Sequence, residues 1–302
     1  MSIDKLISEL SSFVWGYPLL LILIGGGLYL LIISKFIPFK YFFHAIDIIR
    51  GRFDDKKSDG EISHFQALTT ALSATVGMGN IAGVAVAISI GGPGAIFWMW
   101  ISGLIGMSTK FFTSALAVMY RGVDSAGNKQ GGPMYFIVNG LGQKWLPMAI
   151  FFSFCGLVGA LPVFNVNQLT QAINDIVLKP NGVEVGLFSN IIIGLVLIIL
   201  TSIVILGGLK RISKVSAKLV PFMVGVYIIS VLIILIINYD KLPQYLFLIF
   251  YDAFNADYYS GNSAFGGVLG ALIILGIRRG AFSNEAGIGM APMAHGAAKT
   301  NN

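Results

Sequence analysis

Long stretches without a charged residue dominate this sequence. Asp, Glu, Lys and Arg are absent from 10–34, 62–109, 145–174, 185–209, 219–239 and 258–277. A helix that crosses a bilayer needs about 20 apolar residues. Charged residues make up 11% of the chain, whereas soluble domains carry about 25%. The pattern therefore predicts an all-α integral membrane protein.

The second stretch is long enough for two spans, and the sequence GGPG at 91–94 marks the turn between them, since proline removes a backbone donor and glycine weakens a helix. This gives about seven transmembrane segments, the third continuing to about Tyr120. The first segment is too long for a signal peptide and follows the charged residues Asp4, Lys5 and Glu9, so we expect it to be retained.

Basic residues gather in alternate loops. Most of the 20 Lys and Arg residues lie in 35–57, 121–144, 210–218 and 278–299. Because basic loops stay in the cytoplasm, we predict an N-terminus outside and residue 302 inside, in the inner or plasma membrane. The polar stretch 40–64 is expected to contain an amphipathic helix along the interface.

Segment two carries the pattern Gly77-x-Gly79-x-x-Ala82. This pattern matches a dinucleotide fingerprint, but that fingerprint requires a βαβ unit that a membrane helix cannot supply. Close helix packing is a second interpretation of the glycines. A third is a broken helix, because Thr75 and Asn80 flank the glycines in the middle of the span, and such breaks expose carbonyls for a cation and amides for a carboxylate.

Several blocks of sequence resemble the alanine/glycine:cation symporter family. They are 73–85 (SATVGMGNIAGVA), 91–100 (GGPGAIFWMW), Lys110-Phe with Tyr120-Arg121, 131–135 (GGPMY) and 279–300 (RGAFSNEAGIGMAPMAHGAAKT). The last block is the most specific, and the resemblance runs from about residue 15 to the end.

The resemblance implies a leucine-transporter-like fold of two inverted five-helix repeats with one extra N-terminal helix. On that template, 1–302 is a single partial transporter domain. The extra helix is 10–36, the first repeat is 62–240 and the second repeat starts within 258–302. The loop charges agree, because segment two begins inside and segment seven begins outside.

The resemblance also implies the ligand sites. One cation would bind the carbonyl of Thr75 and the side chain of Asn80, and another the carbonyls of Ser73 and Val76. The backbone amides of Gly77, Met78 and Gly79 would hold the substrate carboxylate, with local unwinding and no ligand as the alternative. Gln168 is either a substrate contact or a hydrogen bond between helices. A matching break with a tight pocket is expected at Gly266, Gly267 and Gly270.

Lys110, Arg279 and Glu285 are candidates for an inner gate. Lys110 either extends towards the interface or joins an ion pair in the gate. Arg278 and Arg279 are interpreted as cytoplasmic anchors beyond segment seven, and Glu285 as a partner of these arginines. The sequence assigns no role to the motif Ser283-Asn284-Glu285.

No catalytic pattern is present in the sequence. The single Cys155 excludes a cysteine metal site, and His44, His64 and His295 lack metal-ligand spacing. We expect no enzyme, no cofactor and no metal other than Na+ as coupling ion.

The predicted function is sodium-coupled symport of alanine or glycine. The alternatives are a proton- or sodium-coupled carrier for another small solute, and a non-transporting structural fragment. Nucleic acid is not an expected partner. Since four spans of the family pattern are absent, we also expect the 302-residue chain to be a truncated form that does not transport by itself.

Overall fold

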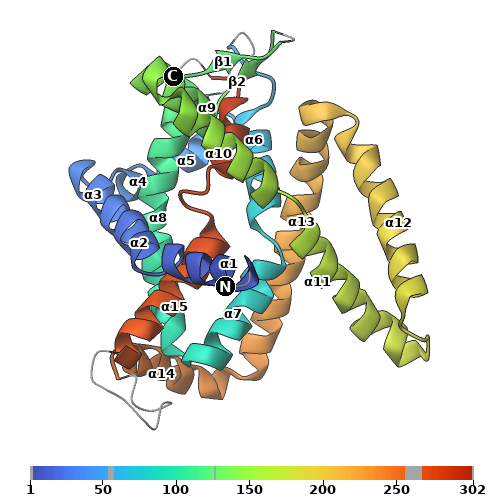
Figure 1. Cartoon of the computed structure of the whole chain (residues 1–302). Helices are drawn as coiled ribbons and strands as arrows, with labels where there is room; N and C mark the ends of the chain where they lie inside the picture. Colours follow the sequence, from blue (N-terminus) through green and yellow to red (C-terminus); the bar gives the residue numbers. More distant parts are fainter. Residues whose placement is uncertain (1–2, 54–57, 126, 256–266, 301–302) are drawn as a thin grey trace.

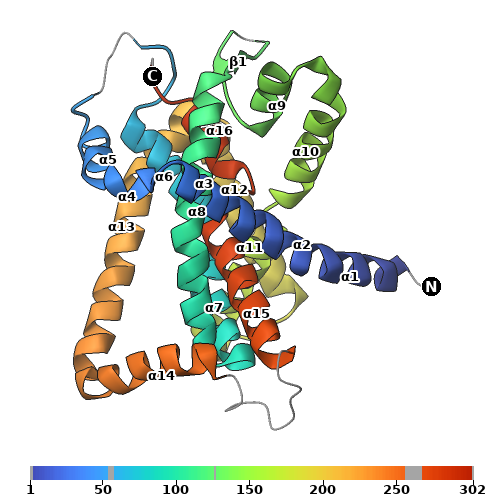
Figure 2. The ribbon, with the colours of Figure 1, turned by 90° about the vertical axis from the view of Figure 1, so that its left-hand side faces the viewer.

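The computed structural model describes residues 3–53, 58–125, 127–255 and 267–300. It is mostly helical, as predicted, with one short β-hairpin formed by β1 (Gly122–Val123) and β2 (Lys129–Gln130). The central element is α8 (Gly94–Met119), which runs through the molecule from end to end (Figure 2). Helix α15 (Gly267–Asn284) lies along α8, and the short α16 (Met290–Gly296) continues towards the end that holds the β-hairpin.

Small residues allow α15 and α8 to approach closely. Gly276 and Gly280 are four residues apart and therefore share a face of α15. A Cβ added at Gly276 would lie 2.5 Å from Trp98 Cβ, and one added at Gly280 would lie 2.8 Å from Ser102 Cβ. This is the small-x-x-x-small packing that membrane helices use in place of a hydrophobic driving force.

Four helical runs within the described residues are long and apolar enough to cross a membrane: Asp4–Ile33, Gly94–Met119, Leu187–Ile205 and Gly208–Ile237. Helices α6 (His64–Thr75) and α7 (Met78–Gly91) make a fifth span if the bent pair is counted as one. The first run consists of α1 (Ile3–Val14), α2 (Tyr17–Leu20), a π-helical turn (Leu21–Gly25) and α3 (Gly26–Ile33). The chain is thus a multi-pass membrane protein, with fewer clear spans than the seven predicted.

Two predicted spans differ from expectation. The stretch 145–174 is divided into α10 (Leu146–Gly159) and α11 (Val163–Ile173), because Pro162 stands between them and cannot donate the helical hydrogen bond. The stretch 258–277 is described only from Gly267, where α15 begins, and this helix extends to Asn284.

The predicted basic loop 210–218 is helical. Helix α12 (Leu187–Ile205) is followed almost directly by α13 (Gly208–Ile237), so the basic residues of that stretch lie in the first turns of α13. Helices α11, α12 and α13 form an arm beside the central helices (Figure 1). Helix α14 (Leu242–Phe254) runs from the end of α13 to α8 (Figure 2). There, Asp252 Oδ2 accepts a hydrogen bond from the Gly94 amide at 2.8 Å.

Shorter helices complete the structure. Helices α4 (Ile37–Lys40) and α5 (Phe42–Ile49) fall in or beside the stretch expected to lie along the interface. Helix α9 (Pro133–Leu141) follows the β-hairpin and leads into α10.

The segment before α6 and the segment after α16 pair with each other through backbone hydrogen bonds. The Lys299 amide donates to the Ile62 carbonyl at 2.8 Å, and the Glu61 amide donates to the Ala297 carbonyl at 2.8 Å. Arg121, just after α8, donates to the carbonyls of Asp59, Ala298 and Thr300. We call 59–62, 297–300 and Arg121 the seam.

Candidate functional site

The helix break predicted in segment two is present. Helix α6 ends at Thr75, the backbone is extended at Val76 (φ −87°, ψ 110°) and Gly77 (φ −157°, ψ −163°), and α7 begins at Met78. The two helices are bent by 42°. The last carbonyls of α6 and the first amides of α7 therefore have no partner within their own helix.

The two glycines of the break have different surroundings. A Cβ at Gly77 would meet nothing within 4 Å, whereas one at Gly79 would lie 2.7 Å from the ring of Phe282 on α15. Close packing therefore explains Gly79 but does not explain Gly77. Space remains beside the backbone at Gly77.

Asn80 connects the break to the end of α15. Its Oδ1 accepts a hydrogen bond from the Gly77 amide at 3.2 Å. Its Nδ2 donates to the carbonyl and the hydroxyl of Ser283, each at 3.0 Å. The Asn80 side chain is thus held by both broken helices.

The Ser283-Asn284-Glu285 motif forms the other half of the site. Helix α15 ends at Asn284, and Glu285 adopts a left-handed backbone conformation with φ 52°. The Thr75 hydroxyl lies 2.8 Å from Glu285 Oε2. The Asn284 Nδ2 donates to Ser102 Oγ on α8 at 3.4 Å. The sequence alone indicated no role for the motif as a unit. An Asn-Glu pair after a long apolar run is nevertheless a signal, because polar side chains in a membrane need partners.

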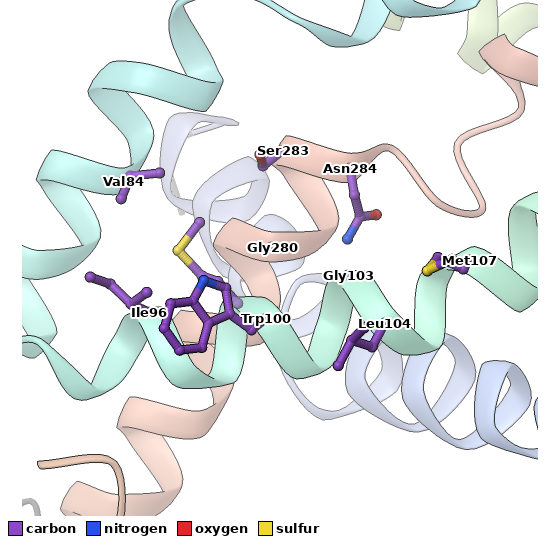
Figure 3. A pocket seen from close by; sticks show the side chains of 10 residues that line it. Val84, Ile96, Trp100, Gly103, Leu104, Met107, Gly280, Ser283 and Asn284 are labelled. Carbon is purple, nitrogen blue, oxygen red and sulfur yellow. The ribbon is translucent and has the colours of Figure 1, made fainter. Parts of the chain in front are cut away.

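A cavity of about 600 Å³ lies beside the end of α15 (Figure 3). The polar groups at this cavity come from Ser283 and Asn284, while Trp100 and Met107 contribute apolar surface from α8. Its lining residues are Val84, Ile96, Met99, Trp100, Gly103, Leu104, Met107, Gly280, Ser283 and Asn284. A mostly apolar cavity with a few polar groups is typical of small-molecule sites.

The second break, predicted around Gly266, Gly267 and Gly270, is not present at Gly270. Gly266 lies outside the described residues, and Gly267 and Gly270 belong to the continuous helix α15. At 1.5 Å per residue, Gly270 lies roughly 20 Å along the helix axis from Ser283. The break falls instead between α15 and α16, where Gly287 (φ 88°) and Gly289 (φ 96°) adopt conformations that favour glycine.

Two further residues predicted as ligands, Gln168 and Ser73, lie on α11 and α6. Gln168 is on α11, a helix that contacts α7, and its role in substrate binding stays a prediction. Ser73, on the last turns of α6, has its hydroxyl 3.3 Å from that of Ser216 on α13.

The arginines of the proposed gate lie within α15. Arg278 Nε donates to the Trp15 carbonyl at 2.9 Å, and this bond holds the N-terminal helical run against α15. Arg279 belongs to the same helix, so both arginines continue segment seven as helix, and their role as cytoplasmic anchors stays a prediction. Thr75, and neither arginine, provides the hydrogen bond to Glu285.

Lys110 on α8 is a charged residue near the break. It interacts electrostatically with Glu285 and with His295. Burial, followed by the positive charges of Lys110 and His64, lowers the pKa of His295 to about 4. Titratable groups from α8, from α16 and from the turn after α15 thus interact with one another.

Broken helices of this kind line the ion and substrate sites of secondary transporters. The comparisons with known proteins agree. The model of the sodium:alanine symporter family matches residues 1–302. The chain belongs to this family.

Several curated relatives are similar over nearly the whole chain. The sodium/alanine symporter AgcS of Methanococcus maripaludis is 43% identical, across 100% of this chain and 64% of its own length. The putative sodium/proton-dependent alanine carrier YrbD of Bacillus subtilis is 39% identical, across 98% of this chain and 57% of its own. The probable sodium/glutamine symporter GlnT of the same organism is 35% identical, across 99% and 59%. The chain therefore spans less than two thirds of the length of these relatives.

Proposed function

We propose that this chain binds Na+ and alanine or glycine as part of a sodium-coupled symport mechanism. The observation that carries the proposal is the break between α6 and α7, where the carbonyl end of one helix and the amide end of the next lie side by side. Carbonyl oxygens suit a hard cation, and the positive end of a helix dipole suits a carboxylate. One break thus offers complementary groups to Na+ and to an amino acid.

The proposed ligands follow from these backbone groups. The carbonyl of Thr75 and the side chain of Asn80 would bind one Na+, and the carbonyls of Ser73 and Val76 another. The amides of Gly77, Met78 and Gly79 would bind the substrate carboxylate, and Gln168 would contact the substrate from α11. Asn80 Oδ1 accepts a hydrogen bond from the Gly77 amide. A cation at Oδ1 together with a carboxylate at the amide would give both groups a new partner.

A small substrate fits the surroundings of the break. The Phe282 ring lies next to Gly79, and the nearby cavity is lined mainly by apolar side chains. Overpacking a closed site excludes additional methylene groups, which would favour alanine and glycine over larger amino acids.

The names of two relatives support a second candidate. GlnT is named as a probable sodium/glutamine symporter, and YrbD as a putative sodium/proton-dependent alanine carrier. A carrier for another small solute, or one driven by protons, is therefore the alternative function. The two inverted repeats and the orientation with residue 302 in the cytoplasm are part of the same proposal.

Equilibrium binding of labelled alanine to the purified chain tests the function. We expect saturable binding in NaCl that is lost in choline chloride and is competed by glycine. Equal binding in both salts would exclude sodium coupling. Competition by glutamine and not by glycine would favour a carrier for another small solute over the alanine or glycine assignment.

A further inference from the structure

Glu285 is the acidic side chain that contacts the α6 break. It follows the last residue of α15, and its φ of 52° directs the chain away from the helix axis at this point. Its Oε2 lies 2.8 Å from the hydroxyl of Thr75, the last residue of α6. The carboxylate is therefore adjacent to the carbonyls that the proposed function assigns to a cation.

The helix ends around Glu285 favour a positive charge. Helices α6 and α15 both end here with their carbonyls, and the C-terminal end of a helix carries about half a negative charge. The hydrogen bond between Thr75 and Glu285 brings these two ends together, and Asn80 of α7 bonds the Ser283 carbonyl beside them. A carboxylate between two carbonyl ends has no electrostatic benefit unless a cation joins it.

Lys110 supplies one positive charge near this carboxylate. Gly106 on α8 lies against Ala286, since a Cβ added there would be 3.0 Å from Ala286 Cβ. Lys110 is one helical turn further along the same face of α8, and it interacts electrostatically with Glu285. His295 of α16 interacts electrostatically with both Lys110 and His64 of α6.

The Thr75 hydroxyl has a second acceptor. It lies 3.0 Å from the Ala71 carbonyl as well as 2.8 Å from Glu285. A hydroxyl has a single proton to donate. If Glu285 turned to another partner, Thr75 would donate to Ala71, and no buried donor would be left unsatisfied.

We propose that Glu285 is the negatively charged residue of the cation site at the end of α6, where it binds Na+ beside the Thr75 carbonyl in competition with the Lys110 ammonium. This inference rests on the proposed function and adds a residue that the inner-gate interpretation had placed elsewhere. Lys110 occupies the negative region when the site is empty and moves away from it when Na+ binds. The Ser283-Asn284-Glu285 motif thus contributes both the charge and, through Ser283, the positioning of Asn80.

The test measures binding of ²²Na+ to the purified full chain in nanodiscs. In Glu285→Gln, the half-saturating Na+ concentration should rise by about tenfold or more, corresponding to about 1.4 kcal/mol. Glu285→Asp keeps the charge and should stay within about threefold of the wild type. Lys110→Gln removes the competing ammonium and should lower the half-saturating concentration. Glu184→Gln, at an exposed position before α12, is the matched control and should bind as the wild type does.

The outcomes separate this inference from the proposed function. If the wild type binds ²²Na+ and Glu285→Gln binds it equally well, the role of Glu285 is wrong and the proposed function stands. If the wild type itself binds no ²²Na+, sodium coupling is wrong and the role of Glu285 is excluded with it. If Glu285→Gln does not fold, Lys110→Gln decides, and unchanged or weaker binding in that variant overturns the inference.

Discussion

The seam and the break involve the same helices but are held together differently. In the seam, backbone amides and carbonyls of 59–62 and 297–300 pair directly, and Ile62 is 1% exposed. At the break, the contacts between α6, α7 and α15 are made by the side chains of Asn80, Ser283 and Glu285. Side-chain bonds can exchange partners without moving the chain. The seam therefore fixes one end of α6, while the break at its other end can adapt to ligands.

The largest expected effect is that of Arg121→Ala in the seam. Arg121 donates to the carbonyls of three residues from two segments, and hydrogen bonds to a charged group contribute about 1.5–3 kcal/mol each. We expect a loss of about 2–4 kcal/mol in the free energy of unfolding, because water can partly replace these bonds. Reversible unfolding in mixed micelles measures this loss of free energy.

Arg52→Ala is the matched control for Arg121→Ala. The guanidinium of Arg52 pairs with Asp47 at 2.9 Å, but its side chain is 65% exposed. Exposed pairs contribute about 0–1 kcal/mol. Equal losses in both variants would contradict the importance of the seam.

Acid should weaken the seam through His295. The Ala298 amide donates to the His295 carbonyl at 3.0 Å, so this residue adjoins the seam. Its pKa is lowered from 6.5 to about 4, which means that the unfolded chain binds the proton more tightly. The contribution of neutral His295 is complete above pH 6.5 and is lost as the pH falls towards 4, by up to about 3 kcal/mol.

Thermal unfolding between pH 7 and pH 4 measures this effect. His295→Gln should lose part of the acid dependence, whereas His44→Gln, at an exposed position on α5, should retain it. An identical pH profile in the wild type and in His295→Gln would show that this histidine does not control acid stability.

The two glycines of the break should respond differently to alanine. Gly79→Ala places a methyl group 2.7 Å from the Phe282 ring, and we expect a loss of about 1–3 kcal/mol in stability from overpacking. Gly77→Ala meets nothing within 4 Å and has an extended backbone, so its stability should stay within about 0.5 kcal/mol of the wild type. Melting temperatures of the two variants measure the difference. A larger loss of stability in Gly77→Ala than in Gly79→Ala would contradict the interpretation that Gly79 is closely packed and Gly77 is not.

Ser283→Ala should have the smallest effect. It removes the hydroxyl that accepts from Asn80 but keeps the Ser283 carbonyl, which accepts from the same Nδ2 at 3.0 Å. A stability loss of about 1 kcal/mol or less is expected, together with weaker Na+-dependent alanine binding. Unchanged binding in this variant would show that the Ser283 carbonyl alone is enough to position Asn80.

The sequence predicted those features that depend on local composition. Apolar length predicted the helical spans, and Gly77 with Gly79 in mid-span predicted the break, because both follow from the properties of neighbouring residues. The count of seven spans did not take account of Pro162, which divides 145–174 into two helices.

Other features depend on contacts between distant segments. The second break was expected around Gly266, Gly267 and Gly270, but in the described part of this region the glycines with positive φ are Gly287 and Gly289. The hydrogen bond from Arg278 to the Trp15 carbonyl joins residues that are far apart in the sequence, so the loop-charge pattern did not indicate it. The bond between Thr75 and Glu285 likewise joins residues on segments that no local pattern relates.

Hydrogen–deuterium exchange of the purified chain tests the central comparison most directly. Amides of the break and of the turn after α15 should become more protected when Na+ and alanine are added together. Amides of the seam should be protected to the same degree with and without these ligands. The account predicts a ligand-dependent change confined to peptides that cover 72–84 and 282–289. A change confined to 59–62 and 297–300, or no change anywhere, would contradict it.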